Sequence, residues 1–264
     1  MAALTASNNT MKGLLLGNSG TGKTGSLYSL AAAGYNLRVL DMDNGSEILY
    51  QLAKDDPAIL ARIDVEKHAD EFSEQGGALR PKLPLKGFSG AAKVLTNWPE
   101  LGKPTTWGTN DILVVDSLTR LGQFIMNHVL AGVGKLALGQ QPSQPDWGAG
   151  ISLQENILAG LFSLPCHVLV IAHVVNITPE GSTTSEGFPS ALGNKLPQKV
   201  GSYFNTTLGY KMIGTGQNKV RKIVTKDPTL GCKVSAPGKL KDDYSLETGL
   251  GEIFTALYGP VKSA

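Results

Sequence analysis

The chain has 264 residues, of which 41% are hydrophobic and 17% charged, and its formal net charge is +2. A mean hydropathy of −0.04, with no apolar run approaching 18 residues, is typical of a globular chain outside the membrane. The N-terminus does not combine positive residues with an apolar stretch, and the two cysteines, Cys166 and Cys232, match neither a disulfide framework nor a zinc site. We therefore expect a cytoplasmic protein with no membrane partner.

The first regular pattern is an apolar segment, a glycine-rich turn and a helical segment over residues 11–32. Met11–Leu16 has the composition of a buried strand, and Ser26–Ala32 that of a helix. The turn between them reads GNSGTGKT and matches G-x-x-x-x-G-K-S/T, the phosphate-binding P-loop, in the setting that the motif requires. We predict a nucleotide site formed by Gly17, Asn18, Ser19, Gly20, Thr21, Gly22, Lys23 and Thr24.

Each residue type in this loop has a chemical role. Glycines allow the backbone to curl so that its N–H groups point at an anion, and the helix that follows adds the positive end of its dipole. Lys23 is expected to reach the β- and γ-phosphates, and the Thr24 hydroxyl to bind Mg²⁺. The loop therefore predicts ATP with Mg²⁺ as cofactor. The alternative is a surface turn that contains glycine and lysine.

A second buried strand is predicted at Asn36–Asp41, and acidic residues follow it. Asp41, Asp43 and Glu47 lie at or just beyond the strand end. In an open α/β sheet the carboxyl ends of the strands line the ligand crevice, so we expect these acids to face the P-loop. The alternative is that they only cap the helix expected at Ser46–Lys54.

The segment DILVVD, Asp111–Asp116, has four apolar residues and ends in an acid, which is typical of a central buried strand. Its position after a P-loop indicates a Walker B element, with Asp116 in the Mg²⁺ shell. In ring ATPases of the AAA+ type and in ABC transporters the catalytic glutamate follows this aspartate directly, whereas Ser117 follows here. The carboxylate that polarises water is therefore expected on another strand, and Asp43 is the best-placed candidate.

A further buried strand, His167–His173, ends in a polar residue at the same edge of the expected sheet. His173 thus stands where a γ-phosphate sensor would lie, although a lone histidine is more often structural. The polar segment Asn176–Gln198 follows and predicts a functional or disordered loop. We also expect a short strand at 61–65, helices at Gly87–Trp98, Ser117–Leu130, Gly148–Leu161 and Leu250–Tyr258, and loops at Pro99–Asn110 and Gly132–Trp147.

Charge is distributed unevenly along the chain. Lys195–Lys241 holds ten basic residues and one acid, a local charge of +9, which leaves −7 for the rest. Two alternating segments, Phe204–Ile213 and Lys219–Lys226, predict a hairpin that carries much of this basic block. The block favours a surface for polyanions, either nucleic acid or the phosphates of a nucleotide held by a neighbouring subunit. The alternative is a solvated, lysine-rich hairpin.

Taken in order, these parts resemble the RecA/RadA superfamily of P-loop recombinases, most of all the short RecA-like core ATPases encoded by bacteriophages and described as recombination or single-strand-annealing factors. The resemblance rests on GNSGTGKT, VLDMD, ILVVDS, LVIAH and ALGNKLPQKVGSYFN. It implies one RecA-like α/β domain over residues 11–258, with a mostly parallel central sheet flanked by helices and a C-terminal antiparallel hairpin extension. Flexible tails are expected at 1–10 and 259–264.

The resemblance also implies roles for individual residues. Asp43 stands where the family has its water-activating glutamate, with Glu47 as the alternative acid. His173 stands where the family has a polar switch that links the γ-phosphate to DNA-binding loops, which correspond to residues 132–147 and 176–198. The resemblance implies three kinds of partner: single-stranded DNA, further copies of the chain in a ring or filament, and a single-strand-binding protein. Candidates for DNA contacts or for contacts across a subunit interface are Lys195, Lys199, Arg221, Lys222 and Lys226.

Three functions are open at this point. The first is a DNA-dependent ATPase of recombination or strand annealing, in which the nucleotide state sensed by His173 controls affinity for single strands. The second is a small-molecule or nucleotide kinase, which the scattered arginines of the chain disfavour because such enzymes group arginines around phosphates. The third is a nucleotide-gated scaffold or regulator with little turnover, which the short acidic side chain of Asp43 favours.

Overall fold

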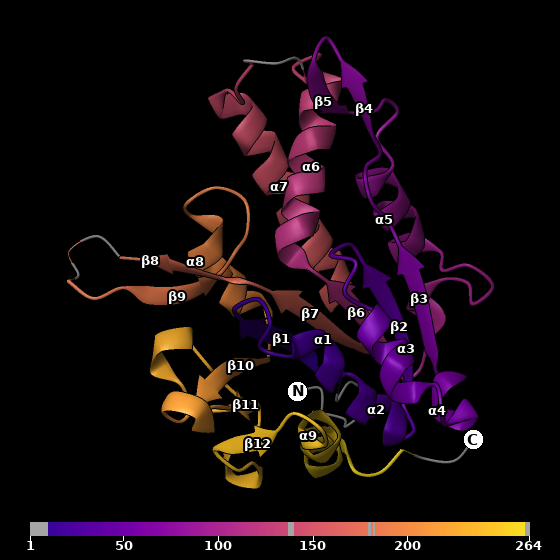
Figure 1. Ribbon diagram of the computed structural model, residues 1–264, viewed down its shortest axis with the longest axis vertical. Helices are drawn as coiled ribbons and strands as arrows, with labels where there is room; N and C mark the ends of the chain where they lie inside the picture. Colours follow the sequence, from indigo (N-terminus) through magenta and orange to yellow (C-terminus); the bar gives the residue numbers. More distant parts are fainter. Residues whose placement is uncertain (1–9, 137–139, 179–180, 182, 262–264) are drawn as a thin grey trace, which may run out of the picture.

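The computed structural model describes residues 10–136, 140–178, 181 and 183–261 (Figure 1). The strands of its main sheet are β1 (Lys12–Gly17), β2 (Asn36–Asp41), β3 (Ile63–Lys67), β6 (Asp111–Asp116), β7 (His167–Ala172), β10 (Thr206–Ile213), β11 (Val220–Val224) and β12 (Asp243–Ser245). Within the described residues they form one eight-stranded sheet in the order β12-β11-β10-β1-β7-β6-β2-β3. The strands from β10 to β3 pair in parallel, and β11 and β12 continue the sheet antiparallel.

The parallel pairing brings the carboxyl ends of four strands to one edge of the sheet. Leu16 in β1 pairs with Ala172 in β7, and Asp116 in β6 pairs with both Ile171 in β7 and Asp41 in β2. The strands β1 and β7 are buried along their whole length, as expected of parallel strands that are covered on both faces. Residues that follow these strand ends are therefore held close together although they are far apart in the sequence.

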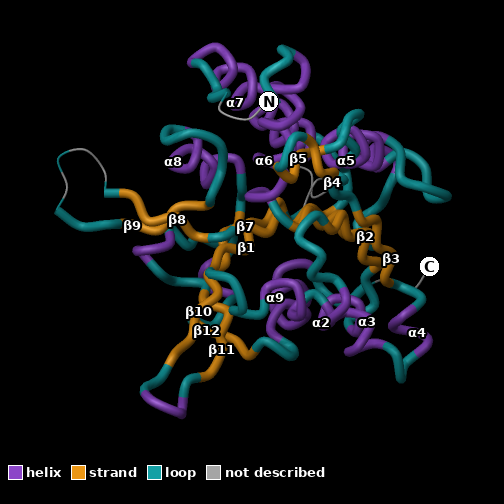
Figure 2. Tube along the Cα trace, turned by 45° about the horizontal axis from the view of Figure 1, so that its top comes forward, coloured by secondary structure: helices purple, strands orange, loops and turns teal. Residues whose placement is uncertain are grey.

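Helices cover both faces of the sheet (Figure 2). On one face lie α2 (Tyr28–Ala32), α3 (Glu47–Ala53), α4 (Pro57–Leu60) and α9 (Gly249–Tyr258), with α1 (Lys23–Ser26) leading into α2. On the other lie α5 (Gly87–Thr96), α6 (Leu118–Gly132), α7 (Gln144–Phe162) and α8 (Leu196–Val200). Alternate side chains of β1 enter the two cores: Leu14 and Leu16 pack in the core with α5 to α8, and Leu15 in the core with α2 and α9. This architecture confirms the expected α/β, RecA-like fold class with its C-terminal antiparallel hairpin.

Two segments that were expected to be irregular contain regular structure. The first lies in the predicted loop 132–147, where α7 already begins at Gln144 and residues 137–139 lie outside the described part. Ser143 and Asp146 form a capping box, in which the Ser143 backbone N–H and hydroxyl both donate to the Asp146 carboxylate, at 2.7 and 2.6 Å. The polar residues that suggested a loop are therefore the start signal of a helix.

The second is the predicted loop 176–198, which contains most of the β8–β9 hairpin and the first residues of α8. Here β8 (Val174–Ile177) pairs antiparallel with β9 (Glu186–Pro189), and the hairpin projects from the main sheet (Figure 1). Residues 179, 180 and 182 lie outside the described part. The polar composition of the segment suggested a loop. Its two short strands pair with each other and, among the described residues, with no strand of the main sheet.

The sequence analysis also missed some short elements. A small hairpin, β4 (Phe72–Gln75) and β5 (Ala78–Pro81), turns at Gly76 and Gly77, both of which have positive φ. The strand β12 was not expected either. Single 3-10 turns lie at Pro104–Thr106, Gly201–Tyr203, Gly216–Asn218, Pro228–Leu230 and Pro237–Lys239.

The ends of the chain were expected to be tails, at residues 1–10 and 259–264. Of these, residues 1–9 and 262–264 lie outside the described part. Along the rest of the chain that the structure describes, no helix combines the length and the apolar character that crossing a bilayer requires.

Candidate nucleotide site

The P-loop joins the end of β1 to the start of α1 and depends on its glycines. Gly20 and Gly22 have φ angles of 75° and 91°, in the left-handed region that side chains disfavour. Gly17 lies against β10, where a Cβ atom would approach the carbonyl oxygen of Tyr210 to 2.7 Å. The loop conformation is therefore available to glycine at these positions and strained for other residues.

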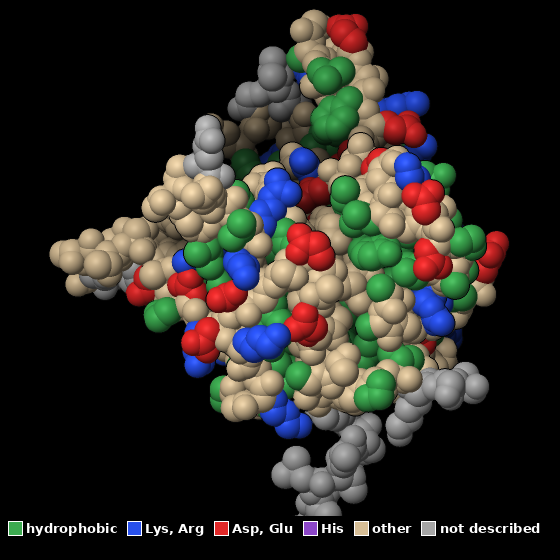
Figure 3. All heavy atoms as spheres, turned by 60° about the horizontal axis from the view of Figure 1, so that its bottom comes forward, with side chains coloured by type: hydrophobic (Ala, Val, Ile, Leu, Met, Phe, Trp, Pro, Cys, Tyr) green, Lys and Arg blue, Asp and Glu red, His purple; other side chains and the backbone are tan. Residues whose placement is uncertain are grey.

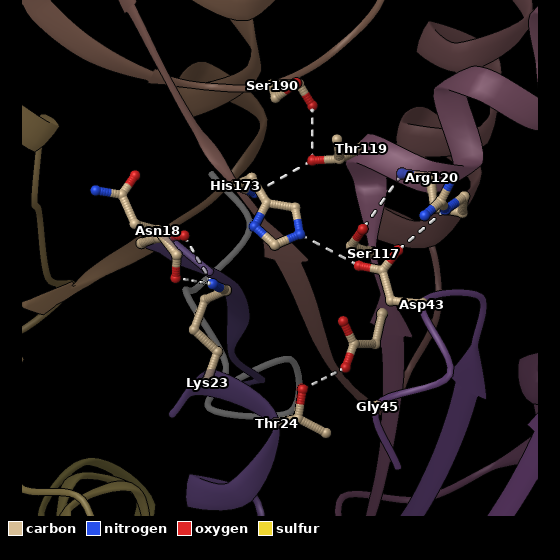
Figure 4. Close-up of polar contacts among 12 residues, drawn as sticks. Asn18, Lys23, Thr24, Asp43, Gly45, Ser117, Thr119, Arg120, His173 and Ser190 are labelled. Atoms are coloured by element: carbon tan, nitrogen blue, oxygen red, sulfur yellow. Dashed lines mark hydrogen bonds and ion pairs between the residues drawn. The ribbon is translucent and has the colours of Figure 1, made fainter. Parts of the chain in front are cut away.

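Lys23 lies inside the loop rather than in solvent. Its side chain is buried, and its Nζ donates hydrogen bonds to the carbonyl oxygens of Gly17 and Asn18, at 2.7 and 2.8 Å (Figure 4). Burial lowers the pKa of Lys23, while the carboxylates of Asp116 and Asp43 raise it in opposition. The ammonium group thus shares one site with both of the predicted acids.

Thr24 and Asp116 form a pair of oxygen ligands. The Thr24 hydroxyl donates to Asp116 Oδ2 at 2.6 Å, and Asp116 is 2% exposed. Burial raises the pKa of Asp116 to about 7, helped by the nearby carboxylates of Asp43 and Asp41 and opposed by the Thr24 hydrogen bond and Lys23. A bound cation would relieve this crowding of negative charge.

These two oxygens suit Mg²⁺, which typically takes one or two protein oxygens and completes its shell with water and substrate phosphates. No cluster of three or more His, Cys, Asp or Glu side chains that could hold a metal occurs among the residues with assigned positions. The residues present therefore fit a cation held jointly with a nucleotide rather than a metal enclosed by protein.

The three acids at the end of β2 and just after it have different roles in the structure. Asp41 is buried and accepts hydrogen bonds from the backbone N–H groups of Asp43, Gly45 and Ser46, at 3.1, 3.2 and 3.0 Å. It therefore shapes the turn before α3, but it does not cap that helix, whose N-cap residue Ser46 makes no side-chain capping hydrogen bond. Asp43 lines the cavity beside the P-loop. Glu47 is exposed, accepts from Gln51 and is not among the described residues that line the cavity, which disfavours it as the alternative acid.

Asp43 makes two further polar contacts (Figure 4). Its Oδ2 lies 3.3 Å from His173 Nε2, and its Oδ1 accepts from Arg120 Nε, also at 3.3 Å. His173 is held by its backbone, because its N–H donates to the Thr119 hydroxyl at 3.2 Å and its carbonyl accepts from the Ser190 N–H at 2.8 Å. The side chains predicted at the ends of β2 and β7 thus meet.

Sequence reasoning missed Arg120 and Thr119, which stand in the first turn of α6 after a cis peptide bond between Asp116 and Ser117. The Ser117 hydroxyl caps this helix by accepting from the Arg120 N–H at 3.2 Å. A helix that starts directly after a strand presents its first turn at the strand end. This rule, applied to the predicted helix at 117–130, could have selected both residues.

The site residues line one cavity of about 790 Å³, a size that suits a small molecule. The phosphate-binding end is formed by the P-loop, Asp43, Asp116, Arg120 and His173. An apolar wall that the sequence did not indicate adds Tyr28, Ile48, Leu52 and Leu246. The lining thus combines charged and polar groups, which suit phosphates, with apolar side chains, which suit the base of a nucleotide.

The basic candidates are divided among different places. Arg221 lines the cavity of its own chain, whereas Lys195 and Lys199 are exposed near α8 and do not belong to the described lining. Lys222 pairs with Asp243 at 3.0 Å and Lys226 with Asp242 at 2.6 Å. The face that α9 shares with the C-terminal strands accordingly mixes basic and acidic side chains (Figure 3). The local charge of +9 is thus partly balanced by acids that follow the basic block in the sequence.

A mostly parallel sheet, a P-loop after β1 and a buried Walker B aspartate at the end of β6 define a RecA-like P-loop ATPase. A family model described as an AAA domain matches residues 9–229, and the chain belongs to that family. In this chain Ser117 rather than glutamate follows Asp116.

The chain is similar in structure to several solved proteins. One is the RadB recombinase, with a TM-score of 0.44, 17% identity and coverage of 83% of this chain and 80% of that one. The flagellar accessory protein FlaH from Methanocaldococcus jannaschii has a TM-score of 0.47 at 9% identity, covering 92% and 88%. A KaiC-like protein from Pyrococcus horikoshii OT3 has a TM-score of 0.42 at 10% identity, covering 82% and 78%. No curated protein sequence matches the chain. The family assignment accordingly rests on the family model.

Proposed function

We propose that this nucleotide-binding ATPase hydrolyses ATP to ADP and phosphate, and that its nucleotide state controls binding to single-stranded DNA in recombination or strand annealing of the phage-encoded type. The observation that carries the hydrolytic part is the convergence of Lys23, Thr24, Asp43, Asp116 and His173 on one cavity. The hydrolytic unit is proposed to be a single domain over residues 11–258.

In the proposed reaction, Lys23 and the N–H groups of the P-loop bind the phosphates. Thr24 and Asp116 would hold Mg²⁺, and a bound Mg²⁺ would supply positive charge that offsets the charge of the phosphates. Asp43 orients a water molecule and accepts its proton as the water oxygen bonds to the γ-phosphorus. The bond from the γ-phosphorus to the bridging oxygen breaks, and its electron pair leaves with ADP.

His173 is proposed to link hydrolysis to the β8–β9 hairpin. Its imidazole contacts Asp43, while its carbonyl accepts from the N–H of Ser190, the residue directly after β9. A shift of Asp43 toward the γ-phosphate therefore changes a contact of the residue that anchors the hairpin. Nucleotide state can in this way bias the position of the hairpin.

The DNA contacts are assigned to basic residues outside that hairpin. Residues 174–194 contain two glutamates and no lysine or arginine, so they offer no cation for backbone phosphates. Lys195 and Lys199 follow directly and are exposed, β11 adds Arg221 and Lys222, and Lys226 lies just after β11. We also propose self-association, in a ring or filament, and a single-strand-binding protein as a further partner.

The test is ATP turnover with and without single-stranded DNA at two salt concentrations. We expect DNA to stimulate turnover and its binding to weaken with salt. Absence of both effects would exclude the DNA-dependent role.

Asp43→Asn tests the assigned base, with Glu47→Gln as the matched control, because Glu47 is an exposed acid outside the described cavity lining. We expect Asp43→Asn to lower kcat by about 100-fold or more while ATP binding persists, and Glu47→Gln to leave both unchanged. Equal effects of the two substitutions would contradict the assignment.

A nucleotide-gated regulator with little turnover is the second candidate. The specific observation in its favour is that both carboxylate oxygens of Asp43 are already in contact, one with Arg120 and one with His173. This candidate predicts a negligible rate in the wild-type protein and no further loss in Asp43→Asn. Measurement of single-turnover hydrolysis of radiolabelled ATP separates the two functions.

A further inference from the structure

Arg120 lines the same cavity but has no assigned role in the proposed hydrolysis. Its backbone is fixed in the first turn of α6 by the Ser117 cap, and its side chain, 44% exposed, lines the cavity at the phosphate-binding end. A residue on the first turn of a capped helix is held more firmly than a residue on a loop. The guanidinium group is therefore presented to the cavity by rigid backbone.

The contacts of the guanidinium leave part of it available. Nε donates to Asp43 Oδ1 at 3.3 Å, and Nη1 donates to Gln123 Oε1 at 2.6 Å (Figure 4 shows the contact with Asp43). Nη2 has no hydrogen-bond partner among the residues that the structure describes. A guanidinium group is planar and carries five N–H donors, so it can bind two anions at once.

The acidic side chains around the cavity would be stabilised by a cation that binds two anions. Asp41, Asp43 and Asp116 lie together at the strand ends, and Asp43 must be close to the γ-phosphate if it is to activate water. A carboxylate beside a phosphate is repelled by it, most strongly where water is excluded. The hydrogen bonds of Lys23 go to P-loop carbonyls and not to Asp43, so Arg120 is the Lys or Arg side chain in contact with Asp43 in this part of the described lining.

We propose that Arg120 recognises the terminal phosphate of the nucleotide bound by its own chain: Nε holds Asp43, and Nη2 donates to a γ-phosphate oxygen. Arg120 then offsets the repulsion between Asp43 and the phosphate and distinguishes ATP from ADP. This inference rests on the proposed nucleotide site. It assigns to a residue of the same chain the stabilisation of charge on the transferred phosphoryl group.

The first test measures discrimination between nucleotides, which requires no turnover. The Kd values of Mg-ADP and of the non-hydrolysable analogue Mg-AMP-PNP are measured for the wild type, Arg120→Gln and Arg62→Gln. Arg62 is the control because it is an exposed arginine that donates to the carbonyl oxygen of Gly34 and is not among the described residues that line the cavity. We expect Arg120→Gln to reduce the preference for AMP-PNP over ADP by about 10- to 100-fold, the effect of a charge-assisted hydrogen bond, while Arg62→Gln preserves it. An unchanged preference in Arg120→Gln, or none in the wild type, overturns the proposal.

The second test separates the role of Arg120 from that of Asp43. We expect Arg120→Gln to lower kcat by about 100-fold or more, without a change in its thermal unfolding. Arg120→Lys is expected to recover only part of the lost kcat, because a lysine cannot bridge two anions in one plane. The double variant with Asp43→Asn is expected to lose less than the product of the two single effects, since the residues share a contact. If Arg120→Gln instead raises turnover, Arg120 restrains Asp43 and the proposal is wrong.

Failure of this inference can be told apart from failure of the proposed function. If Asp43→Asn abolishes turnover and Arg120→Gln does not change kcat or nucleotide preference, only the role of Arg120 is wrong. If no nucleotide binds at all to the wild type, the proposed site itself is wrong.

Discussion

His167, at the start of β7, is a titratable side chain enclosed by the core. It is 1% exposed, its Nδ1 accepts from the Met11 N–H at 2.9 Å, and its ring packs against Tyr35, Phe254 and Tyr258. Burial lowers its pKa to about 4, and the charge of Lys12 acts in the same direction. The imidazole is therefore neutral in the folded protein at neutral pH and accepts its hydrogen bond through an unprotonated nitrogen.

This pKa predicts a loss of stability in mild acid. Between pH 6.5 and about 4 the unfolded chain binds a proton at His167 that the folded chain does not, so the free energy of unfolding falls as the pH is lowered through this window. Between pH 7.5 and 5 we expect this residue to contribute a loss of about 2 kcal/mol, and His167→Asn, which keeps an acceptor, to lack that contribution. Urea unfolding of both proteins at the two pH values measures the difference.

Asp116 acts in the opposite direction, because its raised pKa favours the folded state as the pH falls below about 7. The difference between the wild type and His167→Asn is independent of this contribution, since both proteins retain Asp116. Parallel pH profiles of the two proteins would contradict the prediction.

At the scale of elements, the P-loop depends on the C-terminal part of the chain as well as on its own motif. Gly22, the N-cap of α1, has a φ of 91°, and a Cβ atom there would approach Leu246 Cδ1 to 2.5 Å. Leu246 follows β12, an element that was not expected from the sequence. The loop after β12 thus closes over the phosphate-binding turn.

Gly22→Ala is therefore expected to be destabilising, by about 1–2 kcal/mol from the left-handed backbone alone, and to weaken nucleotide binding. Gly25→Ala is the matched control, because Gly25 is helical and a Cβ atom there meets only Ile48 at an ordinary contact distance of 3.5 Å. It is expected to stabilise the protein by about 0.5–1 kcal/mol. Equal unfolding free energies for the two variants, from urea denaturation, would show that the loop is not constrained in this way.

The elements that could be predicted are those whose signal is local. The strands Asn36–Asp41 and Asp111–Asp116 were predicted with their observed bounds, because a run of apolar residues between polar ends identifies a buried strand. The start of α7 and the β8–β9 hairpin were predicted wrongly as loops. Their polar residues are engaged in a capping box and in a hairpin, and composition alone does not distinguish these from an irregular segment.

At the scale of the whole molecule, the question is how much of the basic block is available to a polyanion. Lys211, Lys222 and Lys226 each pair with an acid, namely Asp227, Asp243 and Asp242. Two of these acids lie just beyond the block in the sequence. The positive potential of the hairpin is consequently smaller than the sequence count implies.

Removing the two outer acids is expected to increase DNA affinity. In the double variant Asp242→Asn/Asp243→Asn, Lys222 and Lys226 are free to bind phosphates, so the plot of log K against log salt for single-stranded DNA should steepen by up to about 1.4. Glu47→Gln/Asp55→Asn is the control, because it changes the net charge by the same amount away from the hairpin. Fluorescence anisotropy at several salt concentrations gives the slopes. Identical slopes for the two double variants would place the DNA contacts elsewhere.

The sequence by itself determined the phosphate-binding turn, the strands that lead to it and the acids at their ends. These signals are local in the chain, and parallel pairing then brings the strand ends to one edge whatever the details of packing. Only the tertiary structure decided which acid faces the cavity, that Arg120 and His173 meet Asp43, and that Lys222 and Lys226 are paired. Such contacts join side chains whose separation in space depends on how whole elements pack. The residues next to a charged side chain in the sequence do not indicate which residue it will pair with.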